Sequence, residues 1–253
     1  MDIEQIVCFI PARYASSRLP GKPLADIAGV PMIMRVYHAA EEARSVGRII
    51  VLTDDDRIYN VVSERGGQVM KTPETCRNGT ERIAYALENI PCEIAVNLQG
   101  DEPLMTGEYI DKAIKPLLRK PGIQISTLAC PIKDEDELYN PSAVKVVCAK
   151  DDIALYFSRS TIPSPVNIPF ADHLRSAQPI WLKHIGLYAY HAGVVRAVMN
   201  SEPTKLEKAE KLEQLRMLEL GYRIHVELIP EGLIGVDTPE DLEEVNRIFR
   251  ERE

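Results

Sequence analysis

Three cationic side chains stand among small residues in the segment 11–24, which reads PARYASSRLPGKPL. The segment directly follows an apolar run at residues 6–10, so we expect it at the end of a buried strand. Small residues let backbone N–H groups approach a phosphate closely, and cations neutralise its charge. The pattern indicates a triphosphate site, with a solvated basic loop as the alternative. The cations are Arg13, Arg18 and Lys22, and the small residues are Ser16, Ser17 and Gly21.

Two acidic motifs, one in each half of the chain, lie at the edges of apolar runs. Asp101 and Glu102 follow the run 94–98 in LQGDEP, and Asp237 precedes a helical pattern in GVDTPEDL. Mg²⁺ prefers hard oxygen ligands and usually binds one or two carboxylates together with substrate phosphates. Asp101 is therefore a candidate metal ligand, unless it only bonds its own turn. Asp237 is a second candidate if it reaches the same ion, and its alternative role is to cap the next helix.

The motif NGTER at residues 78–82 combines a glycine with a cation. Gly79 allows the chain to approach a ligand closely, and Arg82 has the chemistry to contact a base edge or a phosphate. The alternative is a turn that leads into a helix with Thr80 as its cap.

Glu213 falls within an apolar stripe of a helix predicted at 205–220. A carboxylate in such a stripe is costly unless a partner binds it. We therefore interpret Glu213 and Gln214 either as a sugar-binding pair or as part of an ion pair at the helix edge. His184, at the start of a strand, and Arg159, in FSRSTIP, leave the same choice between a ligand contact and a structural role.

The elements that must bring these residues together alternate between apolar runs and helical patterns. This order is typical of an α/β fold with a parallel sheet and helices on both faces, where ligands bind at the carboxyl ends of the strands. Strands are predicted at 6–10, 49–53, 94–98, 143–148, 154–157, 185–190 and 224–229. Helices are predicted at 31–43, 57–65, 81–88, 107–118, 205–220 and 239–250, and a proline-rich loop at 162–183.

The composition excludes several classes of protein. The chain has 253 residues, a length that one α/β domain can span. Its net charge is −8, whereas a general nucleic-acid binder usually carries a basic surface. The five cysteines are widely spaced and include no CxxC pair, so we predict neither a zinc site nor a disulfide framework. Unpaired cysteines of this kind are typical of a protein in the reducing cytoplasm. No apolar run approaches the ~20 residues that cross a bilayer, so we expect no membrane partner.

Taken together, six motifs resemble those of the 3-deoxy-manno-octulosonate (Kdo) cytidylyltransferase family. They occur in the same order as in that family, and the resemblance extends over residues 6–247. They are PARYASSRLPGKPL, LQGDEP, YFSRSTIP, KHIGLYAYHAG, KLEQLR and GVDTPEDLE. The resemblance implies a fold of the nucleotide-diphospho-sugar transferase type, as one domain over residues 1–253. In it, a Rossmann-like, mostly parallel sheet carries helices on both faces, and residues 130–230 contribute a smaller mixed lobe for sugar binding and dimerisation. Mg²⁺ as cofactor, a homodimer and a cytoplasmic location are also implied.

The resemblance assigns a role to each candidate residue. One departure is Asn78, where the family commonly has serine. By resemblance, Arg13, Arg18 and Lys22 bind the triphosphate; Asn78, Gly79, Arg82 and Gln99 lie near the cytidine; Asp101 and Asp237 bind the metal; and Arg159, His184, Tyr188, Glu213 and Gln214 bind the sugar acid.

The implied reaction is attack of the anomeric hydroxyl of Kdo on the α-phosphorus of CTP. Pyrophosphate leaves, and the product CMP-Kdo serves lipopolysaccharide biosynthesis. The catalytic residues would be Arg13, Lys22, Asp101 and Asp237. A close alternative is the same reaction on a sialic acid or an amino-substituted Kdo. A more distant alternative is a non-catalytic nucleotide sensor, which could dispense with both acids.

Overall fold

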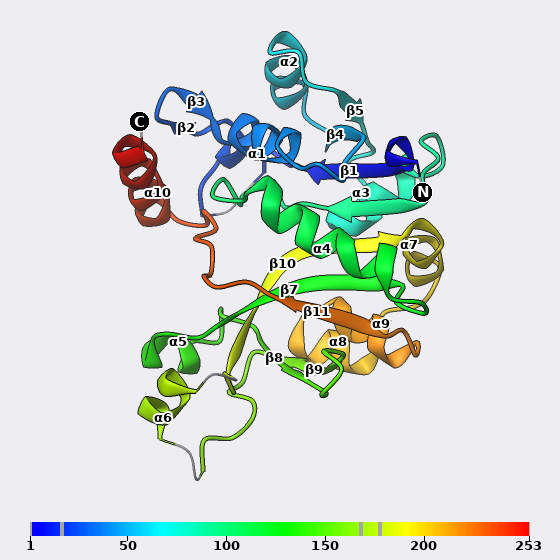
Figure 1. The fold of residues 1–253 in the computed structure, drawn as a ribbon. Helices are drawn as coiled ribbons and strands as arrows, with labels where there is room; N and C mark the ends of the chain where they lie inside the picture. The colour runs from blue at the N-terminus through cyan, green and yellow to red at the C-terminus, as the bar shows by residue number, and fades with distance from the viewer. Residues whose placement is uncertain (1, 16–17, 167–168, 177–178, 253) are drawn as a thin grey trace.

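The computed structural model describes residues 2–15, 18–166, 169–176 and 179–252, which form a nine-stranded sheet flanked by helices (Figure 1). The main path of the sheet follows the order β11-β7-β10-β6-β1-β4-β5, and β8 and β9 extend from β10. The strands of this sheet are β1 (Ile6–Pro11), β4 (Arg48–Thr53), β5 (Val69–Lys71), β6 (Ile94–Asn97), β7 (Ile125–Pro131), β8 (Lys145–Cys148), β9 (Ala154–Ser158), β10 (Leu182–His191) and β11 (Ile224–Leu228). A separate hairpin joins β2 (Asp26–Ile27) to β3 (Val30–Pro31).

The helices connect these strands and cover the sheet. The α-helices are α1 (Met32–Glu41), α2 (Asp56–Glu64), α3 (Gly79–Ala86), α4 (Gly107–Arg119), α5 (Glu135–Tyr139), α6 (Phe170–Arg175), α7 (Ala192–Met199), α8 (Lys205–Glu210), α9 (Gln214–Glu219) and α10 (Pro239–Arg252). Two short 3₁₀ helices are η1 (Ile3–Gln5) and η2 (Lys22–Leu24). The longest helix in the described part of the chain, α10, has 14 residues and rises only about 21 Å. None of the described helices has the length and apolar character needed to span a bilayer.

The N-terminal half forms the parallel part of the sheet. β1 pairs in parallel with β4 and β6, and β4 pairs in parallel with β5. Neighbouring side chains of a strand point to opposite faces, so alternate residues of β1 enter two different apolar clusters. Cys8 and Ile10 pack with α1 and α4, whereas Val7 and Phe9 pack with α3 and α7. The predicted α/β fold, with helices on both faces of the sheet, is confirmed.

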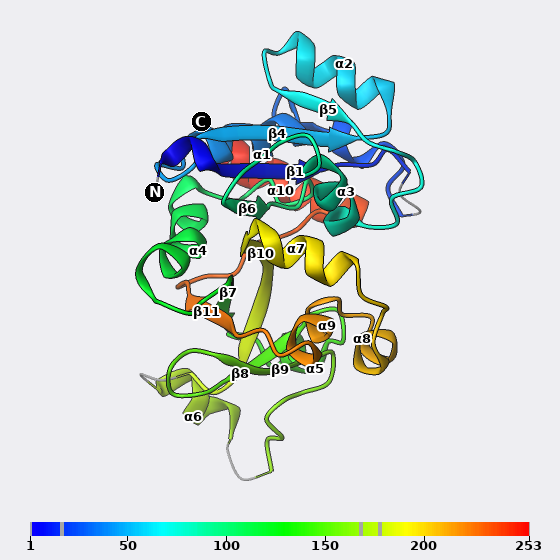
Figure 2. The ribbon, with the colours of Figure 1, turned by 90° about the vertical axis from the view of Figure 1, so that its right-hand side faces the viewer.

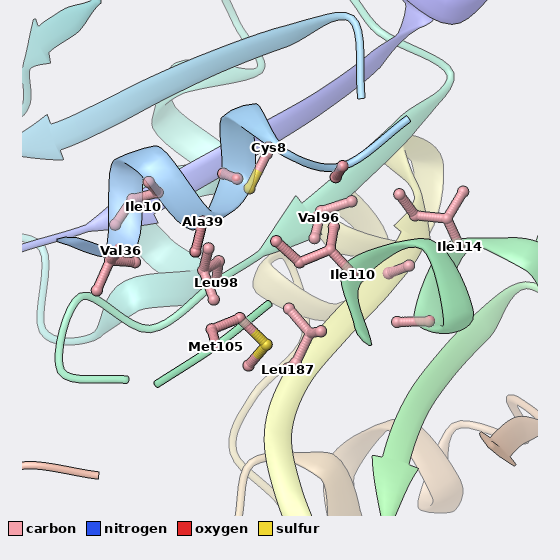
Figure 3. Packing of buried hydrophobic residues seen from close by; sticks show 14 of the residues in the cluster. Cys8, Ile10, Val36, Ala39, Val96, Leu98, Met105, Ile110, Ile114 and Leu187 are labelled. Carbon is pink, nitrogen blue, oxygen red and sulfur yellow. The ribbon is translucent and has the colours of Figure 1, made fainter. Parts of the chain in front are cut away.

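The cluster on the α1 and α4 face fixes the strands that lead to the candidate site. Ala39 of α1 and Ile110 of α4 lie in one cluster with Val96 of β6 and Leu187 of β10 (Figure 3). Burial of a Val, Leu or Ile side chain stabilises the fold by about 1.5–3 kcal/mol. Because this packing fixes both β1 and β6, their carboxyl ends have a defined separation.

β10 reverses the direction of the sheet. It runs antiparallel to β6 on one side and to β7 on the other, and its first residues also pair with β8. A register shift between Ile185 and Tyr188 marks a bulge in β10. Beyond this bulge, β8 and β9 lie with α5, α6, α8 and α9 at the end of the molecule opposite to α2 (Figure 1 and Figure 2). The mostly parallel sheet therefore becomes mixed on the far side of β6.

The single helix predicted at 205–220 is wrong. Two short helices, α8 and α9, replace it, because Lys211 adopts a left-handed conformation with a φ of 54°. No residue of α8 is buried, and Leu206 and Leu220 are exposed, so the apolar stripe expected around Glu213 does not form. Glu213 instead lies at the N-terminus of α9.

The loop predicted at 162–183 is also wrong in part, because it contains α6 and the first residues of β10. His173 of α6 is buried and accepts a hydrogen bond at Nδ1 from the Ile180 N–H, at 3.0 Å. Its Nε2 lies 2.8 Å from the carbonyl oxygen of Ile132. These bonds tie the segment to the end of β7. The predictions also missed β2, β5, β7, α5, α7 and both 3₁₀ helices.

Candidate active site

A pocket of about 340 Å³ opens at the carboxyl ends of β1 and β6. Its walls are the basic loop after β1, the start of α3, the turn after β6 and one residue from the C-terminal part of the chain. Parallel strands commonly place their ligands at this edge. The lining residues are Pro11, Ala12, Arg13, Ala15, Arg18, Lys22, Pro23, Cys76, Arg77, Asn78, Gly79, Arg82, Gln99, Gly100, Asp101 and Asp237.

The basic loop is fixed by a tyrosine at its centre. The Gly21 N–H donates to the carbonyl oxygen of Tyr14 at 3.2 Å, and Gly21 has a φ of 72°, which favours glycine. A Cβ atom at position 21 would lie 2.9 Å from the Tyr14 hydroxyl oxygen. Arg57 of α2 stacks on the Tyr14 ring, with its Cζ 3.2 Å from the ring centroid. The loop therefore needs a glycine here in order to present Lys22 to the pocket.

The other residues predicted in this loop fall into two groups. Arg13 and Arg18 line the pocket and are exposed, so their charges face its mouth. Ser16 and Ser17 lie outside the described residues.

Lys22 lies between the two candidate metal ligands. Its Nζ is 2.7 Å from Asp101 Oδ2 and 3.1 Å from Asp237 Oδ1. The Val236 N–H donates to the carbonyl oxygen of Asp101 at 2.9 Å, so the two acidic segments are joined through their backbones. A terminal nitrogen of Arg18 lies 2.9 Å from Asp237 Oδ2. The predicted convergence of the two acids is confirmed.

Asp237 does not cap α10. The Thr238 hydroxyl accepts a hydrogen bond from the Asp241 N–H at 3.2 Å. The Asp241 carboxylate in turn accepts bonds from the N–H groups of Asp237 and Thr238, at 2.9 and 2.8 Å. The cap alternative for Asp237 is therefore wrong, and its carboxylate is left to bind cations.

The charges of the site are set by burial and by these pairs. Burial alone would lower the pKa of Lys22, but the charges and hydrogen bonds of Asp101 and Asp237 outweigh it and raise the pKa. Burial, together with the neighbouring Asp101 charge, raises the pKa of Glu102 to about 8. Glu102 is therefore mostly protonated at neutral pH.

Asp101 and Asp237 suit a small divalent cation. Both offer hard oxygen donors, and the Lys22 ammonium occupies the point that the two carboxylates share. Within the described ranges, no cluster of three or more His, Cys, Asp or Glu residues is arranged to hold a metal. Mg²⁺ does not need such a cluster, because it usually completes its shell with water and substrate phosphates. The donor set thus fits Mg²⁺ bound together with a nucleotide.

Arg82 is a buried part of the pocket wall. One terminal nitrogen lies 2.7 Å from Asp54 Oδ2, and the other donates to the Thr72 hydroxyl at 2.5 Å. An arginine fixed by an ion pair presents a rigid donor surface. A contact between Arg82 and a base or phosphate stays a prediction.

The start of α3 differs from the predicted cap. The Asn78 side-chain oxygen accepts a hydrogen bond from the Glu81 N–H at 2.8 Å, so Asn78 caps the helix and the Thr80 alternative is wrong. A Cβ atom at Gly79 would lie 3.2 Å from Pro11 Cγ, so this glycine allows α3 to approach the end of β1. Gln99 also lines the pocket, and its Nε2 donates to Asn97 Oδ1 at 3.0 Å.

The residues predicted to bind the sugar acid lie outside the pocket wall, in a neighbouring cluster. Asn78 Nδ2 donates to Glu213 Oε2 at 2.8 Å, which connects the pocket to this cluster. Tyr188 pairs with Asn97 of β6, and its buried hydroxyl lies near Thr127 but forms no hydrogen bond of good geometry with a described residue. Burial is the main cause that raises the pKa of Glu213, and Gln214 is buried in α9. An orphan buried hydroxyl is expected where a ligand supplies the partner.

Arg159 contacts the end of α8, the helix that precedes Glu213. Its Nε donates to the carbonyl oxygen of Glu210 at 2.8 Å, and a terminal nitrogen donates to that of Pro141 at 3.1 Å. The buried Lys145 ammonium donates to the Arg159 carbonyl oxygen at 2.8 Å, which fixes the backbone. No described carboxylate lies within salt-bridge distance of the guanidinium, which remains a cationic site for an anion.

Replacing His184 by glutamine should make the stability less sensitive to acid. Burial lowers the pKa of folded His184 to about 3, whereas an unfolded histidine binds its proton near pH 6.5. Between these values the unfolded state binds more protons, so stability falls as the pH falls, by at most about 1.4 kcal/mol per pH unit from this residue. Urea unfolding at pH 7, 6 and 5 measures the effect, with His191→Gln as the control. An equal decline in both variants and the wild type would contradict the prediction.

The sequence patterns missed three residues of the site. Cys76 and Arg77 line the pocket, and their only signal is that they directly precede the motif at Asn78. Thr127 of β7 is fully buried, and its Oγ1 lies 3.0 Å from His184 Nε2. A hydroxyl inside an apolar strand carries no pattern that points to a site.

Comparisons with known sequences agree with this geometry. The sequence model of a family described as cytidylyltransferase matches residues 7–224. A 3-deoxy-manno-octulosonate cytidylyltransferase from Vibrio cholerae is 48% identical over 248 residues, which cover 96% of this chain and 97% of the relative. The enzyme of that name from Actinobacillus succinogenes is 46% identical over 252 residues, which cover 95% and 96% of the two chains.

Solved structures extend the likeness to three dimensions. A CMP:2-keto-3-deoxy-manno-octonic acid synthetase complexed with CTP superposes with a TM-score of 0.91 and 38% identity, and covers 98% of this chain and 100% of the other. An inositol-1-phosphate CTP transferase from T. maritima, at 14% identity and a TM-score of 0.66 over 97% and 96% of the two chains, shares the fold.

Proposed function

This chain belongs to the 3-deoxy-manno-octulosonate cytidylyltransferase family, and from that premise we propose that it transfers CMP from CTP to Kdo and releases pyrophosphate. The observation that carries the proposal is the convergence of Asp101 and Asp237 on Lys22 at the floor of a cationic pocket. A triphosphate needs the cations, and its activation by a divalent ion needs the acids.

Phosphoryl chemistry of this kind depends on alignment and on neutralisation of charge. Arg13 and Arg18 lie at the pocket mouth, where they would bind the outer phosphates of CTP. Lys22 would exchange its carboxylate partners for phosphate oxygens and offset the charge that develops on the leaving pyrophosphate. The rigid wall formed by Arg82 and the neighbouring amide of Gln99 suit the cytidine end.

Asp101 and Asp237 would hold Mg²⁺, which supplies Lewis-acid stabilisation of negative charge when it is bound. The fit rests on the shared point between the two carboxylates, where a cation already lies. Glu102 is not needed for this role, and burial of its carboxyl raises its pKa to about 8.

The acid sugar would lie in the cluster next to the pocket. The free charge of Arg159 suits the Kdo carboxylate, and the orphan Tyr188 hydroxyl and the Glu213 carboxylate suit sugar hydroxyls. Glu213 meets Asn78 at the boundary between the two regions, so a sugar bound there would have its reactive end beside the triphosphate. Gln214 lies next to Glu213 at the start of α9.

The proposal includes a homodimer that works in the cytoplasm, in lipopolysaccharide biosynthesis. Large apolar side chains are exposed on the part of the chain that carries the sugar cluster, a feature typical of a surface that another chain covers. All five cysteines are unpaired, as in a reducing compartment. The exposed side chains are those of Tyr139, Leu155, Val166 and Leu174.

A panel of acceptors tests the proposed substrate. We expect pyrophosphate release from CTP and Mg²⁺ with Kdo, and a much lower kcat/KM with a sialic acid or an amino-substituted Kdo. Faster release with either of these acceptors would replace Kdo as the substrate. Binding of CTP without pyrophosphate release for any acid sugar would instead indicate a nucleotide sensor.

A further inference from the structure

Thr127 lies at the centre of the β10 bulge. Its Oγ1 is 2.8 Å from the carbonyl oxygen of Leu187 and 3.1 Å from that of Ile185. The same oxygen lies 3.0 Å from Nε2 of His184. Thr127 is fully buried, so no water competes for these three contacts.

The three contacts determine where the protons lie. A threonine hydroxyl carries one proton and accepts through its lone pairs, whereas a carbonyl oxygen only accepts. If the Thr127 proton points at one of the two carbonyl oxygens, it is not available to His184 Nε2. If His184 Nε2 carried no proton, the Thr127 oxygen would face acceptors on three sides with one proton to share. A protonated Nε2 that donates to Thr127 Oγ1 removes this conflict.

We infer that Thr127 fixes His184 as the tautomer protonated at Nε2. Nδ1 of His184 then faces the acid sugar and accepts a hydrogen bond from a sugar hydroxyl. Thr127 is thus a positioning residue for substrate binding. The assignment of the ligand rests on the proposed function, whereas the assignment of the tautomer rests only on the contacts of Thr127.

The surroundings of His184 agree with a neutral acceptor. Its ring meets the edge of Phe157 at 5.1 Å between centroids and lies 5.2 Å from the ring of Tyr188. No described residue forms a hydrogen bond with Nδ1, and no described carboxylate pairs with the ring. Burial lowers the pKa of His184, so the ring does not become a cation at neutral pH.

This arrangement divides the recognition of the substrate between two side chains. A neutral imidazole with an unprotonated Nδ1 repels a carboxylate and attracts a hydroxyl proton. The carboxylate of the sugar acid is therefore left to the guanidinium of Arg159, whose charge no described carboxylate neutralises. His184 would read a hydroxyl, which distinguishes a hydroxylated acid sugar from a deoxy analogue.

The tautomer can be measured directly on the wild-type protein. Long-range ¹H–¹⁵N NMR separates protonated from unprotonated ring nitrogens, and a His184→Gln spectrum identifies the His184 signals. His173 is a matched reference within the chain, because its Nδ1 accepts a backbone N–H and its Nε2 faces a carbonyl oxygen. We expect His184 and His173 to show the same pattern at pH 7. A proton on Nδ1 of His184 would overturn the inference.

Two substitutions test the role in substrate binding. Thr127→Val keeps the shape but removes the hydroxyl, and should raise KM for Kdo about tenfold, because a buried polar partner is lost. KM for CTP and the melting temperature in the presence of CTP should change little. Thr127→Ser keeps the hydroxyl and should restore KM for Kdo to within about twofold of the wild type. Equal KM values for Kdo in Thr127→Val and the wild type would overturn the positioning role.

Addition of Kdo separates failure of this inference from failure of the proposed function. If Kdo is the substrate, its binding should shift the ¹⁵N resonance of His184 Nδ1 and leave that of His173 unchanged. If Kdo is not bound, the tautomer remains but the resonance does not move. Turnover of Kdo by a protein whose His184 carries its proton on Nδ1 would contradict the inference alone.

Discussion

An Asp101→Asn variant is expected to fold normally and to release pyrophosphate from CTP and Kdo roughly 10²–10³-fold more slowly than the wild type. Asparagine keeps the shape of the side chain but loses the negative charge that a divalent ion needs. Asp237→Asn should have an effect of the same order, because both acids meet at the same point around Lys22. Initial rates measured across a magnesium titration check both variants.

The control for these variants is Asp56→Asn. Asp56 of α2 forms a surface ion pair with Lys71 of β5, and 88% of the Asp56 side chain is exposed. Loss of this carboxylate should therefore leave turnover unchanged. Full activity of either test variant at any magnesium concentration would remove that acid from the proposed metal site. A melting temperature within a few degrees of the wild type would show that the loss of rate is not a loss of fold.

A Lys22→Met variant should lose turnover by a similar factor and yet bind Mg²⁺ more tightly in the absence of CTP. The loss of turnover follows because no ammonium remains to offset charge on the leaving pyrophosphate. The gain in metal affinity follows because the Lys22 ammonium now lies between the two carboxylates, where the metal would bind. Isothermal titration with Mg²⁺, with and without CTP, measures the second effect.

Lys112→Met is the matched control for the lysine substitution, since Lys112 forms a surface ion pair with Glu108 of α4 and lies away from the pocket. It should alter neither turnover nor magnesium binding. If Lys22→Met bound Mg²⁺ as weakly as the wild type without nucleotide, the ammonium would not compete with the metal for Asp101 and Asp237. If it turned over normally, Lys22 would have no role toward the phosphates.

The sequence was sufficient to predict the part of the site that depends on strand ends. The loop that carries Lys22 begins where β1 ends, and Asp101 lies in the turn after β6; adjacent parallel strands must end at the same edge of the sheet. Asp237 was harder, because no strand leads directly into it. Its approach depends on the hydrogen bond between the Val236 N–H and the Asp101 carbonyl oxygen, a contact that no local pattern encodes.

The errors have local physical causes. The helix predicted at 205–220 breaks because Lys211 takes a left-handed conformation, although lysine is an ordinary helix former. The buried ion pair of Arg82 in α3 depends on Asp54, which follows β4 and is distant from Arg82 in the sequence. Thr127 carries no charge and no motif, so only the distances around its hydroxyl reveal a role.

The antiparallel course of β10 has a consequence for how the enzyme moves. Its C-terminal residues pair with β6, and its N-terminal residues pair with β8, so one continuous strand spans the nucleotide pocket and the sugar cluster. A hinge between the two regions would have to bend β10 at its bulge and shear it against β7, which pairs with residues on both sides of that bulge. The distance between the nucleotide pocket and the sugar cluster is therefore set in the free protein. Substrates must then enter through movements of the side chains and loops at the rim.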